Sequence, residues 1–210
     1  MTERGMIFNG EMVRALLDGR KTQTRRPIKW KQTRFTEIGE REDGSKWPWS
    51  EDAEHACDFW HPCPFGAVGD RIWVRETWAE AGASAPDLKL YRANYPEHVP
   101  SIYENVPPAE EIRWTPSIHM PRWASRILLE ITDVRVERLN SIHDVDAMRE
   151  GIQNLTTCSH ADFGIPGVVN AQHPVRAFQL LWESIHGADS WRANPWVWVI
   201  EFKRVEGGAA

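Results

Sequence analysis

The segment Gly19 to Arg26, GRKTQTRR, holds the residue types with the clearest chemical potential in this chain. Lys21 and Thr24 lie three positions apart, so a turn in this segment can bring the tips of their side chains together. A threonine hydroxyl becomes a useful nucleophile when a base lies within hydrogen-bonding reach. Lysine serves as that base only if its pKa falls, which burial or neighbouring cations such as Arg25 achieve. Because Lys-x-x-Thr is a common spacing, the pattern permits this chemistry without requiring it.

The same segment opens a longer basic run that contains no acidic residue. Its cations are Arg20, Lys21, Arg25, Arg26, Lys29, Lys31 and Arg34. The run is either a solvated face with surface ion pairs or a site for an anion or phosphate just beyond a helix end. The whole chain carries a net charge of −5, which is unusual for a protein that coats long nucleic acid. We therefore expect only weak, salt-dependent RNA binding through this run.

Two carboxylates are candidates for acid–base work. Glu76 shares the apolar face of a predicted strand with Ile72 and Val74, so it is either paired structurally or part of a pocket. Structural pairing with an arginine is the favoured interpretation of Glu76. Glu150 lies at the end of a predicted helix, where its charge opposes the helix macrodipole. This mildly unfavourable placement either has no purpose or is tolerated because the carboxylate points into a site.

A cluster of metal-ligand residue types follows the basic run. His55, Cys57, His61 and Cys63 form the pattern H-x-C-x3-H-x-C. Zinc accepts these ligands, but structural zinc sites commonly use a closely spaced Cys pair and a separate second pair. The spacing here is atypical, so packing within a loop is the favoured interpretation. We predict no metal and no other cofactor.

The tract Trp114 to Trp123, WTPSIHMPRW, is dense in side chains that contact ligands. A planar heterocycle can stack on tryptophan, and His119 and Arg122 add polar contacts next to Trp123. A buried turn leading into the next strand explains the same residues equally well. We include His119, Arg122 and Trp123 among the candidate substrate-binding residues.

The elements that must position these residues follow from hydrophobic periodicity and from capping residues. A first helix is expected over 9–18, capped by Asn9 and ended by Gly19. Another helix is expected over 174–186, with Pro174 in its first turn. A helix over 141–150, with its core near 144–150, is expected to be capped by Ser141 and to place Val145 on its apolar face. Strands are expected near 70–76, 126–132 and 196–203. Residues 29–68, 79–113 and 153–172 are expected to be loops, the first with room for a short hairpin.

Length and composition bound the class of protein. The chain has 210 residues with 41% hydrophobic and 26% charged, which is typical of one globular domain spanning 1–210 with insertions near 29–68 and 79–113. Three cysteines argue against a disulfide framework and favour a reducing compartment. No apolar run has the length of a membrane span, and the N-terminal residues show no signal peptide, so we expect a cytoplasmic protein. Short helices among strands favour an α+β fold with a mixed sheet or partly closed barrel.

Several of these segments resemble a known family. GRKTQTRR after a short helix resembles the signature of the ASCH domain, GDRIWVRE resembles its Gly-Asp strand, and DAMREGI resembles the helix that carries a glutamate in the family. WVWVIEF resembles the closing strand. The likeness excludes the two insertions, and the whole chain also resembles proteins of phages and prophages. ASCH domains are similar to PUA domains, so the resemblance implies a small PUA-like β-barrel with short flanking helices.

The resemblance also implies an activity. Some ASCH proteins are amidohydrolases that remove acyl groups from N4-acylated cytidines, and others are thought to bind or cleave RNA. The implied working group falls on Lys21 as general base, Thr24 as nucleophile and Glu150 as proton relay, with Glu76 as the alternative carboxylate. Arg26 matches a further signature position and would stabilise charge on the carbonyl oxygen. The expected partner is a small nucleoside; a non-catalytic RNA- or nucleotide-binding module and a ribonuclease are the alternatives, and the oligomeric state is left open.

Overall fold

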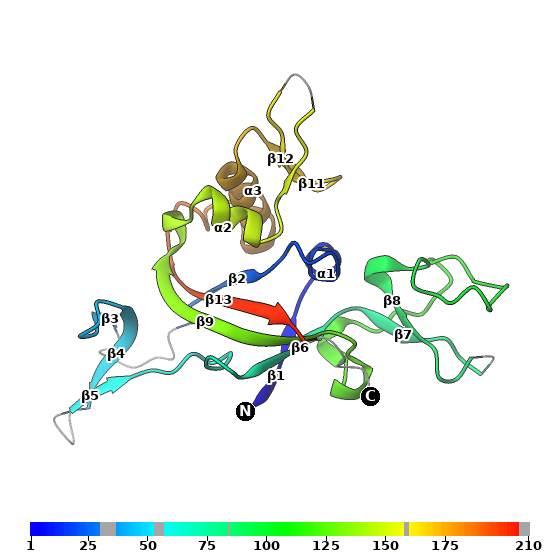
Figure 1. Cartoon of the computed structure of the whole chain (residues 1–210), viewed down its shortest axis with the longest axis horizontal. Coiled ribbons are helices and arrows are strands. Elements are labelled where there is room, and N and C mark those ends of the chain that lie inside the picture. Colours follow the sequence, from blue (N-terminus) through cyan, green and yellow to red (C-terminus); the bar gives the residue numbers. More distant parts are fainter. Residues whose placement is uncertain (30–36, 53–56, 84, 158–159, 206–210) are drawn as a thin grey trace.

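The computed structural model describes residues 1–29, 37–52, 57–83, 85–157 and 160–205 of the chain. Within these residues the protein is a mixed α+β structure built mostly from strands (Figure 1). A five-stranded sheet forms its centre, with the strand order β1-β6-β9-β13-β2. These strands are β1 (Glu3–Ile7), β6 (Arg71–Arg75), β9 (Leu128–Arg138), β13 (Trp196–Arg204) and β2 (Gln23–Pro27).

The strands expected near 70–76, 126–132 and 196–203 are all confirmed as members of this sheet. β1 runs parallel to β6, and the other neighbouring pairs are antiparallel. β9 and β13 are the two longest strands, and they run side by side as curved ribbons through the middle of the molecule (Figure 1).

The expected barrel is not closed by backbone hydrogen bonds. In the described part of the chain, β1 and β2 are the free edges of the sheet. A side chain spans the seam instead: Arg26 on β2 donates from Nη2 to the Ile7 carbonyl at 2.7 Å. Its guanidinium also lies over the Phe8 ring, 5.3 Å from the centroid. Pro27 ends β2 without an N–H, so the ladder has no donor there to continue.

Both faces of β13 are largely buried, which explains its almost continuous apolar sequence. On one face, Trp198, Ile200 and Phe202 pack in a core that includes residues of α1 and β6. On the other face, Val197 and Val199 pack against a second core formed by α2 and α3. The alternation predicted for β13 is confirmed, and each face of this strand serves a different core.

The helices follow the sequence signals to different degrees. The three α-helices within the described residues are α1 (Gly10–Leu17), α2 (Asp144–Arg149) and α3 (Pro174–His186). For α1 the predicted cap is confirmed, because the Asn9 side chain accepts a hydrogen bond from the Met12 N–H at 2.9 Å. Gly19 follows with a φ of 72°, a conformation that favours glycine. α3 starts at Pro174 and is capped by Gly187, as expected.

The prediction for the second helix is wrong at its start. Ser141 ends a short 3-10 turn, and Ile142 is extended, so α2 begins only after His143. Val145 is 63% exposed rather than on the apolar face, and Ala147 is buried in its place. A six-residue helix has too few turns for periodicity to identify its buried side. Glu150 is the C-cap residue of α2.

The segments expected to be loops contain small sheets. The first insertion forms an antiparallel sheet of β3 (Glu37–Glu40), β4 (Lys46–Asp52) and β5 (Cys57–Trp60). The second holds the pair β7 (Trp78–Glu80) and β8 (Lys89–Tyr91) and the 3-10 turn η1 (Arg92–Asn94). Residues 153–172, expected to be a loop, form a sheet of β10 (Gln153–Asn154), β11 (Phe163–Ile165) and β12 (Val169–Ala171).

These small sheets pack on the main body of the molecule rather than serving as bare connections. Trp47 of β4 meets Trp198 of β13 edge to face, with ring centroids 5.0 Å apart. Trp78 of β7 belongs to a third apolar cluster with Tyr91 and Met120. Two-residue and three-residue strands carry too little alternation to be recognised from sequence. Among the described residues, no helix is long and apolar enough to cross a membrane.

Candidate functional site

Lys21 is held at the junction between α1 and β2. Its backbone N–H and that of Arg20 both donate to the Ala15 carbonyl, at 3.0 and 2.9 Å, so the chain turns tightly after Gly19. This turn directs the Lys21 side chain inward, where it has no exposed surface. Its Nζ donates to Glu150 Oε2 at 2.8 Å and to the Glu150 carbonyl at 2.9 Å. Two residues separated by 129 positions in the sequence therefore form a buried ion pair.

Glu150 receives a second cation from the neighbouring strand. Arg25 Nη1 donates to Glu150 Oε1 at 3.2 Å, and the Arg25 side chain is fully buried. These cations offset the unfavourable position of a carboxylate at a helix C-terminus. Gly151 follows with a φ of 110°, and a Cβ there would lie 3.2 Å from the Ala15 Cβ. Glycine therefore lets the end of α2 approach the α1–β2 turn closely enough for the ion pair to form.

The surroundings of Lys21 shift the pKa of its amine downwards. Burial lowers the pKa of Lys21, the charge of Glu150 opposes that shift, and Arg26 and Arg25 lower the pKa further. Burial also lowers the pKa of Arg26, while Glu150 opposes the change. A lysine with a lowered pKa is available as a proton acceptor. The cations that sequence analysis invoked do lower the pKa of Lys21, but burial is the larger cause.

Arg25 links this pair to a wider network of charges between α2 and the sheet. Its Nη2 lies 3.1 Å from Glu137 Oε2 and 3.4 Å from Asp146 Oδ2. Arg135 on β9 extends the network with ion pairs to Glu137 at 2.7 Å and to Glu201 at 2.6 Å. Through its two terminal nitrogens, Arg25 holds Glu150 to Glu137 and Asp146, which restricts the orientation of Glu150.

Sequence reasoning missed the role of Arg25, treating it only as a nearby cation. The signal that indicates it is the period of two along β2, because Gln23 and Arg25 alternate with Thr24 and Arg26. Gln23 is completely buried, and its Oε1 accepts from Arg135 at 3.3 Å. Residues 23 and 25 thus face α2 and its charge network, and the sequence alone does not say which face of β2 that is.

Thr24 lies on the opposite face of β2 from Arg25. It pairs with Ile200 in the β2–β13 ladder, and Ile200 belongs to the first core. Its side chain is buried, with 1% of the residue exposed. In the described structure no hydrogen bond joins the Thr24 hydroxyl to Lys21, so the expected contact between their tips is not seen. The structure brings Lys21 to Glu150 and Arg25 instead.

Glu76 lies in a separate cluster. Arg126 binds it with two hydrogen bonds, from Nε to Oε1 at 2.9 Å and from Nη2 to Oε2 at 3.0 Å. Asn94 Oδ1 accepts a further bond from Arg126, and the guanidinium lies 4.0 Å from the centroid of the Tyr91 ring. Glu76 is 2% exposed, and none of its hydrogen bonds reaches Lys21. The paired arginine agrees with the structural interpretation favoured from the sequence.

A histidine beside this cluster has one defined protonation state. His98 Nε2 accepts from the Tyr91 N–H at 3.0 Å, so its Nδ1 carries the proton that is shared with the Asn94 carbonyl at 3.2 Å. A second proton on Nε2 would place two donors against each other. Burial lowers the pKa of His98; the charge of Arg126 also lowers it, and Glu76 and two backbone hydrogen bonds oppose the shift. The unfolded chain therefore takes up this proton more readily than the folded chain.

We expect the free energy of unfolding to fall as the pH drops below the ordinary histidine value of 6.5. The stabilisation is complete above that value and is lost as the pH falls through the lower pKa of the folded state. Denaturant unfolding of wild type and of His98→Gln over a pH series measures this. The difference between the two curves should shrink towards low pH. The exposed His119→Gln variant is the control, and parallel curves for His98→Gln and wild type would contradict the assignment.

The remaining predicted substrate-binding residues lie on the 3-10 turns η2 (Ser117–His119) and η3 (Arg122–Ala124). His119 is exposed, and Arg122 donates to Glu3 Oε2 at 2.8 Å. Trp123 is 60% exposed and contacts Trp78 edge to face. None of these contacts reaches Lys21 or Glu150, so the structure does not bring this tract together with the ion pair.

The metal-ligand pattern of the first insertion does not converge in the part of the chain that is described. Cys57 is exposed and Cys63 is buried, with burial raising the pKa of the Cys63 thiol to about 11. His61 shares a hydrogen bond with Ser50 at 2.8 Å, and His55 lies outside the described residues. Among those described, no group of three His, Cys, Asp or Glu side chains is placed to hold a metal ion.

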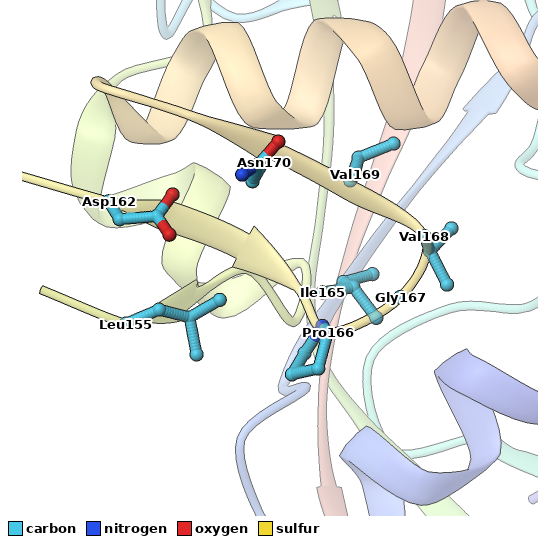
Figure 2. A pocket seen from close by; sticks show the side chains of 8 residues that line it. All are labelled: Leu155, Asp162, Ile165, Pro166, Gly167, Val168, Val169 and Asn170. Atoms are coloured by element: carbon cyan, nitrogen blue, oxygen red, sulfur yellow. The ribbon is translucent and has the colours of Figure 1, made fainter.

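Two cavities lie beside the β11–β12 hairpin, and neither is lined by Lys21 or Glu150. One, of about 380 Å³, is lined by Leu155, Asp162 and residues 165–170 of the hairpin (Figure 2). The other, of about 300 Å³, lies between the hairpin and α1, and its wall includes Arg20 and Gly151. Since a Cβ on Gly151 would lie 3.7 Å from the Lys21 Cβ, this wall separates the second cavity from the Lys21 side chain.

Comparison with known proteins adds no relative to this description. No family model matches the chain, and neither a curated protein nor a solved structure matches it. A function is therefore argued from the residues and their contacts.

Proposed function

We propose that this protein is an amidohydrolase that removes the acyl group from an N4-acylated cytosine nucleoside or a related small amide. We also propose that it is an ASCH-type protein whose five-stranded sheet is an incomplete PUA-like barrel sealed by Arg26. The proposal needs no metal or organic cofactor. Its main support is the buried contact of 2.8 Å between Lys21 Nζ and Glu150, two residues that the resemblance assigns to one working group.

The hydrogen bonds of Lys21 suit a role as general base. A neutral amine has two N–H donors and one lone pair. The carbonyl and Oε2 of Glu150 use two donors, and no third partner is present among the described residues. The downward shift of the Lys21 pKa increases the share of this neutral form, whose lone pair can accept a proton. Thr24, three residues further along the chain, is the hydroxyl that the resemblance assigns to the same working group.

In the proposed reaction, Lys21 takes the Thr24 hydroxyl proton as Oγ1 bonds to the acyl carbon. The carbonyl electron pair moves to oxygen, where the charge of Arg26 stabilises it. Collapse of this intermediate breaks the bond from carbon to N4, and the proton on Lys21 passes to the leaving nitrogen. Water then attacks the threonine ester and gives a proton to Lys21. Lys21 passes this proton to Thr24 Oγ1 as the bond from carbon to Oγ1 breaks and the carboxylic acid is released. Glu150 accepts and returns protons through its contact with Lys21.

Substrate access requires movement in this proposal, because the Lys21 side chain has no exposed surface. The cavity between α1 and the β11–β12 hairpin is lined by Arg20 and Gly151, which are close to Lys21. Gly151 forms the wall between that cavity and Lys21, and a glycine wall leaves little side-chain bulk to displace. A displacement of the chain at Gly151 would connect this cavity with the Lys21 side chain.

Incubation with N4-acetylcytidine tests the proposed function directly. Cytidine and acetate should appear in equal amounts, measured by chromatography, at a rate that depends on enzyme concentration. A series of longer acyl groups on the same nucleoside then defines the preferred substrate. A folded protein that releases cytidine from none of these compounds would refute the proposal.

Replacing the two carboxylates separates catalysis from structure. Glu150→Gln keeps the shape and removes proton transfer, so kcat should fall about 10²- to 10⁴-fold while KM changes little. Glu76→Gln leaves Arg126 without its anion, and the free energy of unfolding should fall by about 3 kcal/mol. The folded fraction of Glu76→Gln should retain the wild-type kcat. Loss of turnover in Glu76→Gln but not in Glu150→Gln would move the catalytic role to Glu76.

A further inference from the structure

A second surface with its own chemistry lies at the β1 edge of the central sheet. Arg71, Trp73 and Arg75 share the outer face of β6. Their neighbours on β1 are Glu3, Gly5 and Ile7. The 3-10 turns η2 and η3 lie against this edge: Arg75 donates to the Ile118 carbonyl, and Arg122 bonds Glu3 at 2.8 Å. We call the surface formed by Arg71, Trp73, Arg75, Lys89, Arg122 and Trp123 the Trp123 face.

An exposed indole is the most unusual feature of this face. Trp123 is 60% exposed, the highest value among the aromatic side chains that are exposed in the described structure. It meets the buried Trp78 at 90°, with ring centroids 5.3 Å apart, which fixes its position at the surface. Lys89 Nζ lies 5.6 Å from its centroid. A supported indole with an attendant cation is a platform on which an unpaired base can stack.

The second aromatic of the face is held flat against the sheet. A Cβ on Gly5 would lie 2.6 Å from Trp73 Cζ2, so the indole rests directly on the β1 backbone. Glycine at position 5 is what permits this close approach. Arg75 lies over the same ring, 5.4 Å from its centroid. The Arg75 guanidinium therefore lies beside the indole and forms no ion pair with a described carboxylate.

The charge of the face is positive although the chain as a whole is negative. Glu3 bonds Arg122 and lies 4.0 Å from Arg71, so it compensates these arginines only in part. In the part of the chain described, neither Arg75 nor Lys89 has an ion pair with a carboxylate. Arg71 and Arg75 are four residues apart on β6, which places them about 13 Å apart along the strand with Trp73 between them.

We propose that the Trp123 face binds single-stranded nucleic acid, with a base stacked on Trp123 and phosphates bound by Arg75, Lys89 and the neighbouring arginines. An exposed indole, a second and partly buried indole, and incompletely compensated cations match this ligand, because a single strand offers both free bases and a row of phosphates. The face is distinct from the Lys21–Glu150 pair, and the proposal does not depend on amide hydrolysis.

The basic run of the signature segment is less suitable for this role. Lys21 and Arg25 are fully buried and paired with Glu150, and Arg20 pairs with Asp18 at 2.7 Å. Lys31 and Arg34 lie outside the described residues. Of the described cations of this run, Lys21 and Arg25 are turned inward and Arg20 is paired, whereas Lys29 is exposed. The Trp123 face differs in combining its cations with an exposed indole.

Fluorescence anisotropy with labelled oligonucleotides of about 10 nucleotides tests the proposal. Single-stranded RNA and DNA of one sequence should bind, and Trp123→Ala should weaken the affinity by about 5- to 150-fold. Arg75→Gln should lower the slope of log affinity against log salt by about 0.7. A preference for RNA over DNA would identify the biological ligand as RNA, and equal binding would indicate recognition of bases and phosphates alone.

Matched variants on other surfaces serve as controls. Phe59→Ala removes a half-exposed aromatic of β5, and Arg176→Gln removes an exposed cation of α3; both should bind as wild type does. Circular dichroism checks that each variant is folded, and Lys89→Gln replaces Trp123→Ala should the latter unfold. Three results would overturn the proposal: no binding of a single strand at low salt, equal binding of a duplex or of polyglutamate, or equal losses in the control variants.

Discussion

The Lys21→Met variant is expected to lose at least about 10³-fold in kcat for release of cytidine from N4-acetylcytidine. Methionine preserves most of the volume and removes the amine that accepts the proton. Its effect on folding should be moderate, because Arg25 still lies 3.2 Å from Glu150 and compensates its charge. Alanine at this position would instead leave a cavity beside Gly151. Methionine is therefore the sharper test of chemistry, measured by chromatography of the products.

Lys29→Met is the matched control, since Lys29 is an exposed lysine of the same basic run. It should retain wild-type turnover. The wild-type rate should also fall with decreasing pH, because the Lys21 amine accepts a proton only above its lowered pKa. Wild-type activity in a folded Lys21→Met variant would eliminate Lys21 as the base, and the buried pair would then have only a structural role.

The second large effect is expected at Thr24, where two substitutions separate the hydroxyl from the methyl group. Thr24→Val keeps the β-branched shape and removes the nucleophile, so turnover should fall to the level of Lys21→Met. Its stability should equal or exceed that of wild type, because the hydroxyl makes no hydrogen bond with another described residue and the side chain is buried beside Ile200. Thr24→Ser keeps the hydroxyl and should retain part of the activity, with a loss of about 1 kcal/mol in unfolding free energy.

Mass spectrometry after rapid acid quenching gives an independent measurement. An acyl group on the peptide containing Thr24 is expected in wild type and in Thr24→Ser, and none in Thr24→Val. Wild-type turnover by Thr24→Val would show that water attacks the amide directly. Lys21 would then activate that water, and the role of Thr24 would be confined to packing. The position of Thr24 on the opposite face of β2 from Arg25 makes this comparison decisive for the mechanism.

The effects of these variants on hydrolysis and on oligonucleotide binding also separate the two proposed activities. Lys21→Met and Thr24→Val should leave oligonucleotide binding unchanged, because neither residue contacts the Trp123 face. Trp123→Ala should leave hydrolysis of a free nucleoside unchanged for the same reason. If each variant affects only its own assay, the protein has two independent sites.

Local signals in the sequence were sufficient for the elements that flank the candidate site. Asn9 and Gly19 delimit α1 because capping depends on residues within one turn of the helix. β13 was recognisable because nine residues give enough alternation to identify both of its faces. The position of Lys21 just after α1 followed from the same local rules. The association of Lys21 with Glu150 came from resemblance to a family rather than from periodicity.

Tertiary structure decided what lies within reach of Lys21. Its contact with Glu150 depends on the β2–β13–β9 register and on the close approach that Gly151 permits, and both join distant parts of the chain. The same register turns Arg25 towards Glu150 and Thr24 away from it. Alternation along β2 shows only that the two side chains face opposite sides, and not which side faces α2. The tract from His119 to Trp123 faces a different surface for the same reason. Sequence determined which residue types were present and which local elements form, whereas packing between distant segments determined which of those residues meet.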